Sequence, residues 1–329
     1  MKKIAIAGYH FTGSGVIDDL FREFDNVYQP KTECESRYLQ DMDGISDLEF
    51  HLVNNPNRLY INQAIDRFLR YCKRNSKRYM KIYGPEWYSL CEEYISNLTK
   101  FQYTGYNLTH LQERSNWYPL YVKWMTRLQK LKPSKFRNSK RNNYFPHEKM
   151  FHAMPSESEF LEVTRSFVDS LVNSMTKNKN VDYVMIDQMF GGNNPSRYLR
   201  YVNDVKAFVV DRDPRDLYIN QRNMHDHLLP VDPHQFCIHF RDIRKCIGDE
   251  NPNVMYISIE DMIYRYDEMV PVVCKFVGID PKHHILPKRY FDPSISSKGT
   301  RTWERYPQYS EAVSIIEKEL PEFLYSYSD

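Results

Sequence analysis

Small residues cluster between Gly8 and Gly15, where a short apolar run gives way to a segment with helical periodicity. Residues 4–7 (Ile-Ala-Ile-Ala) have the length of a buried strand. The apolar positions after the cluster recur on one helix face: Val16, Ile17, Leu20 and Phe21. A glycine-rich turn lets the backbone approach an anion, and the first N–H groups of a helix can donate to it. The pattern predicts a cradle for phosphate or sulfate.

This loop differs from the P-loop of ordinary ATPases at two positions that matter for chemistry. Gly8 and Gly13 have the spacing of the glycines in GxxxxGK[ST]. Ser14 occupies the lysine position, however, and Gly15 the hydroxyl position. An ATPase needs that lysine on the phosphates and that hydroxyl on Mg²⁺. The sequence therefore argues against an ATPase and predicts no metal ligand here; a turn without any ligand is the alternative.

A second charged segment follows the strand predicted at residues 205–210. It reads Asp-Arg-Asp-Pro-Arg-Asp over residues 211–216, with Pro214 at the first position of a helix. Ligands of parallel sheets bind at the carboxyl ends of the strands, and arginine binds phosphate in a bidentate manner. The segment is therefore a candidate phosphate site, and a charged turn closed by internal salt bridges is the alternative.

Strands alternating with helices predict an α/β fold with a doubly wound parallel sheet in three layers, α/β/α. We expect residues 1–329 to form one such domain, with residues 60–150 as a helical, partly basic insertion that contributes to acceptor binding. Further strands are predicted at 181–186 and 253–259. Helices are predicted at 59–73, 85–98, 120–131, 156–175, 195–202, 214–222 and 261–277, the last ending at Gly278.

Composition narrows the function classes. The net charge of +2 gives no global support for nucleic-acid binding. No apolar run approaches the roughly 20 residues of a membrane helix, and no signal peptide is apparent, so we expect a cytoplasmic protein. The six scattered cysteines predict reduced thiols without a disulfide or zinc site. Residues 123–149 interleave basic and aromatic residues, which is typical of either a solvated face or a lid for an anionic substrate.

Four segments, taken together, resemble the donor-binding segments of sulfotransferases that use 3′-phosphoadenosine 5′-phosphosulfate. Residues 8–16 resemble the 5′-phosphosulfate loop of that family. Arg212 after its strand, with Asn220 eight residues later, resembles the 3′-phosphate segment, where the family has Arg and Ser. Residues 256–261 (YISIED) resemble the YEDL segment, and residues 297–303 (SKGTRTW) resemble the late RKG…W loop. The four occur in the family's order and cover roughly residues 1–25 and 180–305.

The resemblance implies a sulfotransferase that moves a sulfuryl group from this donor to a hydroxyl acceptor and releases adenosine 3′,5′-bisphosphate, with no metal. We expect a bacterial-type carbohydrate sulfotransferase, with a carbohydrate or a glycolipid headgroup as acceptor. The tyrosine-rich, basic middle of the chain suits an anionic carbohydrate. The residues that the resemblance assigns to the donor are Gly8, Phe11, Thr12, Gly13, Ser14, Gly15, Val16, Arg212, Asn220, Lys298, Gly299 and Thr300.

One departure concerns the charge on the leaving group. The family's loop carries Lys or Arg where this chain has Phe11. Either another cation supplies the charge, or the reaction is slow, or the protein only binds its ligand. The candidate cations are His10, Lys298, Arg301 and Arg305. A noncatalytic nucleotide- or carbohydrate-binding protein and a P-loop kinase are the alternative functions.

An acceptor hydroxyl must lose its proton, so we expect a general base. The two candidates we favour are His10 in the loop and Asp187 at the end of a predicted strand. His225 and His227 are further candidates. A side chain at Gly13 is expected to fill the space of the anion and abolish binding.

Overall fold

The computed structural model describes residues 1–30, 34–106, 115, 117–131, 147–177, 179–224, 228–245 and 250–327. The chain divides into two compact units. The first comprises Met1–Gln40, Lys81–Gly84 and Val168–Asp329, and the second Asp41–Met80 and Pro85–Phe167.

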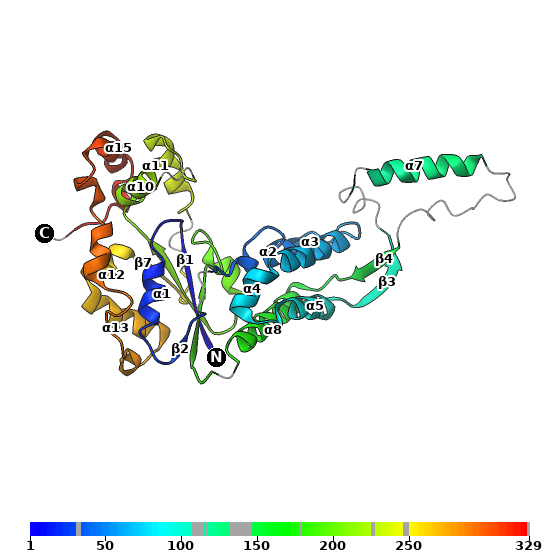
Figure 1. The fold of residues 1–329 in the computed structure, drawn as a ribbon, viewed down its shortest axis with the longest axis horizontal. Helices are drawn as coiled ribbons and strands as arrows, with labels where there is room; N and C mark the ends of the chain where they lie inside the picture. The colour runs from blue at the N-terminus through cyan, green and yellow to red at the C-terminus, as the bar shows by residue number, and fades with distance from the viewer. Residues whose placement is uncertain are drawn as a thin grey trace. The chain divides into compact units, whose positions relative to one another are not determined.

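The first unit is built on a five-stranded parallel sheet in the order β2-β5-β1-β6-β7 (Figure 1). Its strands are β1 (Lys2–Gly8), β2 (Val27–Tyr28), β5 (Tyr183–Asp187), β6 (Val205–Asp211) and β7 (Val254–Ser258). The register pairs Gly8 with Val210 and Ile6 with Asp187. The carboxyl ends of β1, β5 and β6 therefore share one edge of the sheet, where ligands of such sheets bind.

Both faces of this sheet are covered, which confirms the predicted α/β class. Ile4, Ala5, Ile6 and Ala7 are all completely buried. Because successive strand residues point to opposite faces, burial of all four requires a layer on each side. The helices of this unit are α1 (Gly15–Phe21), α9 (Pro195–Leu199), α10 (Pro214–Asn223), α11 (Pro233–Asp242), α12 (Ile259–Tyr264), α13 (Tyr266–Val277), α14 (Pro293–Ser296) and α15 (Ser310–Glu319), with the end of α8 (Glu157–Met175).

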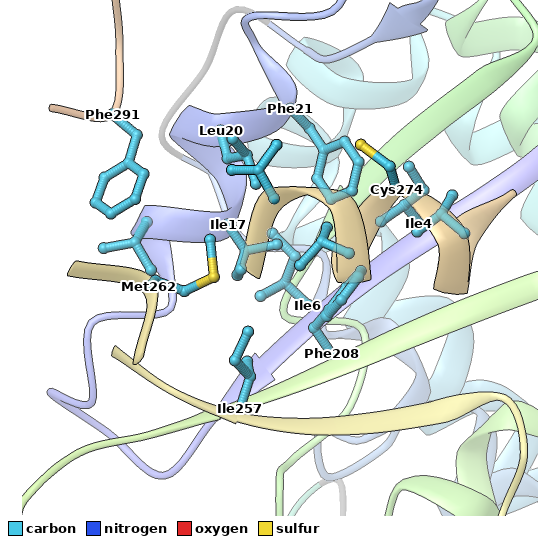
Figure 2. Close-up of a cluster of buried hydrophobic side chains, with 14 of the residues drawn as sticks. Ile4, Ile6, Ile17, Leu20, Phe21, Phe208, Ile257, Met262, Cys274 and Phe291 are labelled. Carbon is cyan, nitrogen blue, oxygen red and sulfur yellow. The ribbon is translucent and has the colours of Figure 1, made fainter. Parts of the chain in front are cut away.

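One sheet face packs against α1, α12 and α13. Figure 2 shows Ile17, Leu20 and Phe21 of α1 directed at Ile6 and Phe208 of the sheet. The spacing of these α1 residues buries a single helix face, so α1 is fixed on the sheet and the preceding loop is held at the strand edge.

The single helix predicted at 261–277 is wrong in one respect, because two helices occupy this stretch. Ser258 caps α12 by accepting from the Asp261 N–H at 2.9 Å. α12 ends at Tyr264. The next residue, Arg265, has a φ of −123° that departs from helical geometry, and α13 starts directly after it at Tyr266. Both helices bury apolar residues in the same cluster, so the apolar periodicity does not reveal the break. The predicted end at Gly278 is confirmed by its left-handed φ of 80°.

The second unit is largely helical. Its elements are α2 (Ile45–Glu49), α3 (Ile61–Arg74), the start of α4 (Ser76–Tyr83), α5 (Trp87–Leu98), α7 (Trp117–Lys130), the start of α8, and an antiparallel pair of strands, β3 (Phe101–Gly105) and β4 (Glu148–His152). The sequence did not predict this pair. Residues 101–104 are all exposed, so β3 lacks the alternation that marks a half-buried strand.

Two further observations concern the whole described chain. Over these residues, no helix combines the length and the apolarity that crossing a bilayer requires. The five cysteines that the structure describes form no disulfide with one another; Cys246 lies outside the described residues.

A buried carboxylate ties the end of α1 to a distant loop. Glu23 is completely buried, and its Oε2 lies 2.6 Å from Nε2 of His284. Its oxygens also accept hydrogen bonds from the backbone N–H groups of Lys288, Tyr290 and Phe291 at 2.9–3.1 Å. These contacts satisfy the carboxylate inside the protein, where an unpaired charge would be costly.

Replacing Glu23 by alanine is expected to lower the free energy of unfolding by about 3 kcal/mol, because the buried backbone donors lose their acceptor. The measurement is urea denaturation at neutral pH. Glu268→Ala, at an exposed glutamate that pairs with Arg265, is the matched control and should change stability by less than about 0.5 kcal/mol. Equal effects of the two variants would contradict the assigned role of Glu23.

Candidate functional site

The loop between β1 and α1 is a tight turn with left-handed backbone at three positions. These are His10 (φ 76°), Phe11 (φ 53°) and Gly13 (φ 81°). The Tyr9 N–H donates to Oγ1 of Thr12 at 3.3 Å and closes the turn. Within the part of the chain that the structure describes, the N–H groups of residues 12–15 have no hydrogen-bond acceptor. Four backbone donors therefore lie together in the loop predicted to bind an anion.

The two glycines in the middle of this loop have different surroundings. A Cβ added at Gly13 would lie 2.5 Å from Cδ1 of Ile259, whereas one added at Gly15 would meet no atom within 4 Å. The expectation that a side chain at Gly13 would fill the space of the anion stays a prediction. The structure adds a separate reason against a side chain there, because its Cβ would collide with the terminal methyl group of Ile259 and would also strain a left-handed residue.

Gly13→Ala is expected to lower the free energy of unfolding by about 1 to 3 kcal/mol, since strain and collision act together. Gly15→Ala has neither penalty and should leave stability nearly unchanged. A double-mutant cycle with Ile259→Ala, measured by urea denaturation, isolates the contribution of the collision. In the Ile259→Ala background, Gly13→Ala should cost only the part of the unfolding free energy that comes from backbone strain. Equal stability of the Gly13→Ala and Gly15→Ala variants would refute the steric argument.

Phe11 supplies an apolar anchor at the position where a cation was expected. Its partly buried ring packs against a cluster on α10, α11 and α15 that includes Leu217 and Phe236. The ring centroid of His10 lies 4.1 Å from that of Phe11. This packing holds the loop against the neighbouring helices. A contact between Phe11 and the donor stays a prediction.

The loop lies against the segment at the end of β7, which in turn contacts the start of α10. Gly13 approaches Ile259 closely, as described above. The adjacent Glu260 is completely buried, and its Oε1 accepts from the Asp213 N–H at 3.0 Å. Burial raises the pKa of Glu260 to about 8, so this carboxyl is largely protonated at neutral pH. Three of the four segments singled out in the sequence thus meet at the sheet edge.

The fourth segment is tied to the same place through α10. An Nη atom of Arg212 donates to the Gly299 carbonyl. Asp216, completely buried in the first turn of α10, accepts from the N–H groups of Arg301 at 3.0 Å and Thr302 at 2.7 Å. Burial raises the pKa of Asp216, while the hydrogen bonds from Thr302 oppose the shift. Asp216 therefore fixes the late loop against the start of α10.

The two arginines of the RDPRD segment have different partners. Arg215 pairs with Asp213 at 2.7 Å and with Glu317 at 2.9 Å, and its guanidinium lies 3.8 Å from the Trp303 ring centroid. Arg212 forms no ion pair with any residue in the described ranges, and its buried Nε has no hydrogen-bond partner there. The alternative of an internally closed charged turn thus holds for Arg215 and fails for Arg212.

The remaining residues assigned to the donor are placed less closely. Lys298 is exposed, and its carbonyl accepts from Arg305 at 2.6 Å. Thr300 is buried, and its hydroxyl bonds to the Ser297 carbonyl and the Tyr264 hydroxyl. Asn220 is half-buried on α10. The donor contacts of these three residues stay predictions.

A pocket of about 300 Å³ opens beside the cradle at the end of β5. Ser14, Asp18 and Asp187 line it, with Glu35 and Gln188. The amide of Gln188 donates to Oγ of Ser14 at 3.0 Å and so orients this hydroxyl. Sequence analysis missed Gln188, although it directly follows a strand end, and its left-handed φ of 53° is visible only in the structure.

The two favoured base candidates have different settings. Burial, followed by the negative charges of Asp18 and Glu35, raises the pKa of Asp187 to about 7. A carboxylate with this pKa can accept a proton near neutral pH, and it lies beside Ser14. His10 is exposed and does not line this pocket. His225 and His227 lie outside the described residues.

Comparison with known proteins gives matches among solved structures alone. No protein-family model matches the chain, and no curated protein does. A sulfotransferase from Alicyclobacillus acidocaldarius has 12% identity and a TM-score of 0.37 over 97% of this chain and 95% of the other. The sulfotransferase domain of the Synechococcus PCC 7002 olefin synthase has 10% identity and a TM-score of 0.38 over 91% and 87%. The sulfotransferase domain from the curacin biosynthetic pathway has 11% identity and a TM-score of 0.40 over 96% of each chain.

Proposed function

We propose that the protein transfers a sulfuryl group from 3′-phosphoadenosine 5′-phosphosulfate to a hydroxyl acceptor. The observation that carries this proposal is the convergence of four distant segments on one site. The loop at residues 8–15, the predicted anion cradle, contacts residues 259–260. Residues 259–260 contact the start of α10, and Arg212 and α10 form hydrogen bonds with residues 299–302. Each segment resembles a donor-binding segment of sulfotransferases, and their contacts suit binding of a single nucleotide.

The donor's two anionic ends match two sets of unpaired hydrogen-bond donors. We assign the 3′-phosphate to Arg212, whose Nε lacks a partner among the described residues, with Asn220 as a second donor. We assign the 5′-phosphosulfate to the N–H groups of residues 12–15. Lys298, Gly299 and Thr300 would cover the nucleotide from the loop that Asp216 fixes.

The reaction would be an in-line displacement at sulfur. The acceptor oxygen forms a bond to sulfur while the bond from sulfur to the bridging oxygen breaks, and adenosine 3′,5′-bisphosphate departs. Asp187 takes the acceptor's proton, and the cradle N–H groups with the Ser14 hydroxyl stabilise charge on the sulfuryl oxygens. Because Phe11 is apolar, another cation would neutralise the negative charge on the leaving oxygen, and the candidates are His10, Lys298, Arg301 and Arg305.

We infer that the acceptor is a carbohydrate or glycolipid hydroxyl without negative charge near the reacting group. Four carboxylates line the pocket beside the cradle: Asp18, Asp19, Glu35 and Asp187. Arg22 pairs with Asp18 at 2.6 Å and Asp19 at 3.2 Å, so it offsets only part of this charge. An anionic sugar would be repelled here, in contrast to the expectation from the basic middle of the chain, most of which lies outside the described residues.

The test compares ligands by isothermal titration and then measures turnover. We expect micromolar binding of adenosine 3′,5′-bisphosphate, much weaker binding of 5′-AMP, and transfer of radioactive sulfate from the donor to neutral sugar acceptors. Preference for ATP with Mg²⁺ would support the kinase alternative. Tight binding without transfer to any acceptor would support a noncatalytic nucleotide-binding protein.

A further inference from the structure

The helix α7 carries its largest apolar side chains on its exposed side (Figure 1 labels α7). Trp117 is 79% exposed and Trp124 60%, and these are two of the chain's four tryptophans. Leu131, directly after the helix, is 81% exposed. The other large apolar residues of this exposed set are Leu120, Tyr121 and Leu128.

These six residues form one continuous stripe. Apart from the adjacent pair Leu120 and Tyr121, they follow one another at three or four positions, and at about 100° per residue all six fall within roughly 100° of the helix circumference. The residues of the opposite side, which include Val122, Met125 and Thr126, are half-buried. Large apolar side chains thus gather on the exposed side of α7, which is the reverse of an ordinary surface helix.

Positive charge borders the stripe along one edge. Lys123, Arg127 and Lys130 are exposed and recur at helical spacing next to the apolar residues. Residues 117–131 contain no Asp or Glu. The exposed side of α7 thus combines an apolar stripe with a basic edge, and the helix itself contributes no carboxylate.

We propose that α7 binds the surface of an anionic lipid bilayer and lies in the plane of the interface. Trp and Tyr rings favour the headgroup level, aliphatic side chains enter the acyl boundary, and Lys and Arg reach anionic headgroups. With 14 residues the helix is too short to cross a bilayer. A second copy of α7 would bring like charges together without a carboxylate on either helix, so the charge favours a lipid surface.

This inference stands apart from the proposed reaction, since it uses no residue of the donor site or of the pocket. A surface-bound enzyme would, however, have ready access to an acceptor that is itself a membrane lipid. The test therefore measures binding to lipid and not turnover.

The experiment is sedimentation of the full chain with vesicles of phosphatidylcholine alone or mixed with phosphatidylglycerol, followed together with tryptophan emission. We expect sedimentation and a blue shift with the anionic vesicles, little of either with phosphatidylcholine, and weakening by salt. The double variant Trp117→Ala/Trp124→Ala should lower the partition coefficient by about tenfold or more. The double variant Lys123→Gln/Arg127→Gln should lower binding to the vesicles that contain phosphatidylglycerol and should not change binding to phosphatidylcholine vesicles.

Leu228→Ala is the matched control, because Leu228 is 70% exposed and lies outside α7. It should bind as the unchanged protein does. Failure to sediment with anionic vesicles, or full binding by the double tryptophan variant, would overturn the proposal. Light scattering that shows a dimer lost in the double variant would instead assign the stripe to a second copy, which also overturns it.

Discussion

Replacing Arg212 by alanine should weaken binding of adenosine 3′,5′-bisphosphate by about 2 to 3 kcal/mol, roughly 30- to 160-fold. The reason is that Arg212 is charged, forms no ion pair with the described residues and has an unpartnered Nε, so its side chain can bind the 3′-phosphate. Isothermal titration measures the loss. Binding of 5′-AMP, which lacks that phosphate, should stay nearly the same.

The comparison of the two nucleotides separates direct binding from loop support. Arg212 also holds the Gly299 carbonyl, so alanine could loosen the late loop. An equal loss for 5′-AMP and the bisphosphate would point to the loop and remove Arg212 from the 3′-phosphate site. Arg265→Ala, at an exposed arginine that pairs with Glu268, is the charge-matched control and should affect neither nucleotide.

Asp187→Asn should lower kcat by about 10²- to 10⁴-fold and leave binding of the bisphosphate unchanged, because the amide cannot take the acceptor's proton. The unchanged enzyme should show a rate that rises with pH through about 7, where Asp187 loses its own proton. Single-turnover sulfate transfer over a range of pH measures both effects. A rate that is flat from acid to neutral pH would exclude Asp187 as the base.

Two neighbouring carboxylates make this pH test sharper. Asp18 is the charge that most raises the pKa of Asp187 after burial, so Asp18→Asn should shift the acidic limb of the profile to lower pH. Asp19 lies on the same turn and pairs with the same Arg22, but it is not among the main charges that act on Asp187. Asp19→Asn should therefore leave the limb in place. Equal shifts in both variants would mean that overall charge, and not Asp18, sets the profile.

The cradle was predictable because its signals are local. A β-branched apolar run, small residues and one apolar helix face are all found within residues 2–21, and the structure places β1, a tight loop and α1 there. The start of α10 was equally readable, since Pro214 stands at its first position. Local chemistry determines these elements, so the sequence alone locates them.

The sequence could not predict that Arg212 and Arg215 have different partners. Both lie in one short charged segment, and only the fold brings Glu317 and Trp303 to Arg215 and leaves Arg212 without an ion pair in the described ranges. The pocket has the same origin, because Asp18, Glu35 and Gln188 come from separate segments. Contacts between segments that are far apart in the sequence produce no local pattern of periodicity or spacing from which they could be predicted.

The order of the strands has a consequence for how this protein folds. β1 pairs with β5 and β6 and with no other described strand, and both partners begin after residue 182. The strand before the cradle loop therefore cannot pair until the long segment between β1 and β5 has folded back. Parallel pairings between strands so far apart in the sequence form slowly. During synthesis the loop at residues 8–15 would be made long before β5 and β6, the strands that pair with β1. The proposed donor site should consequently become able to bind its ligand only in the last stage of folding, together with the sheet itself.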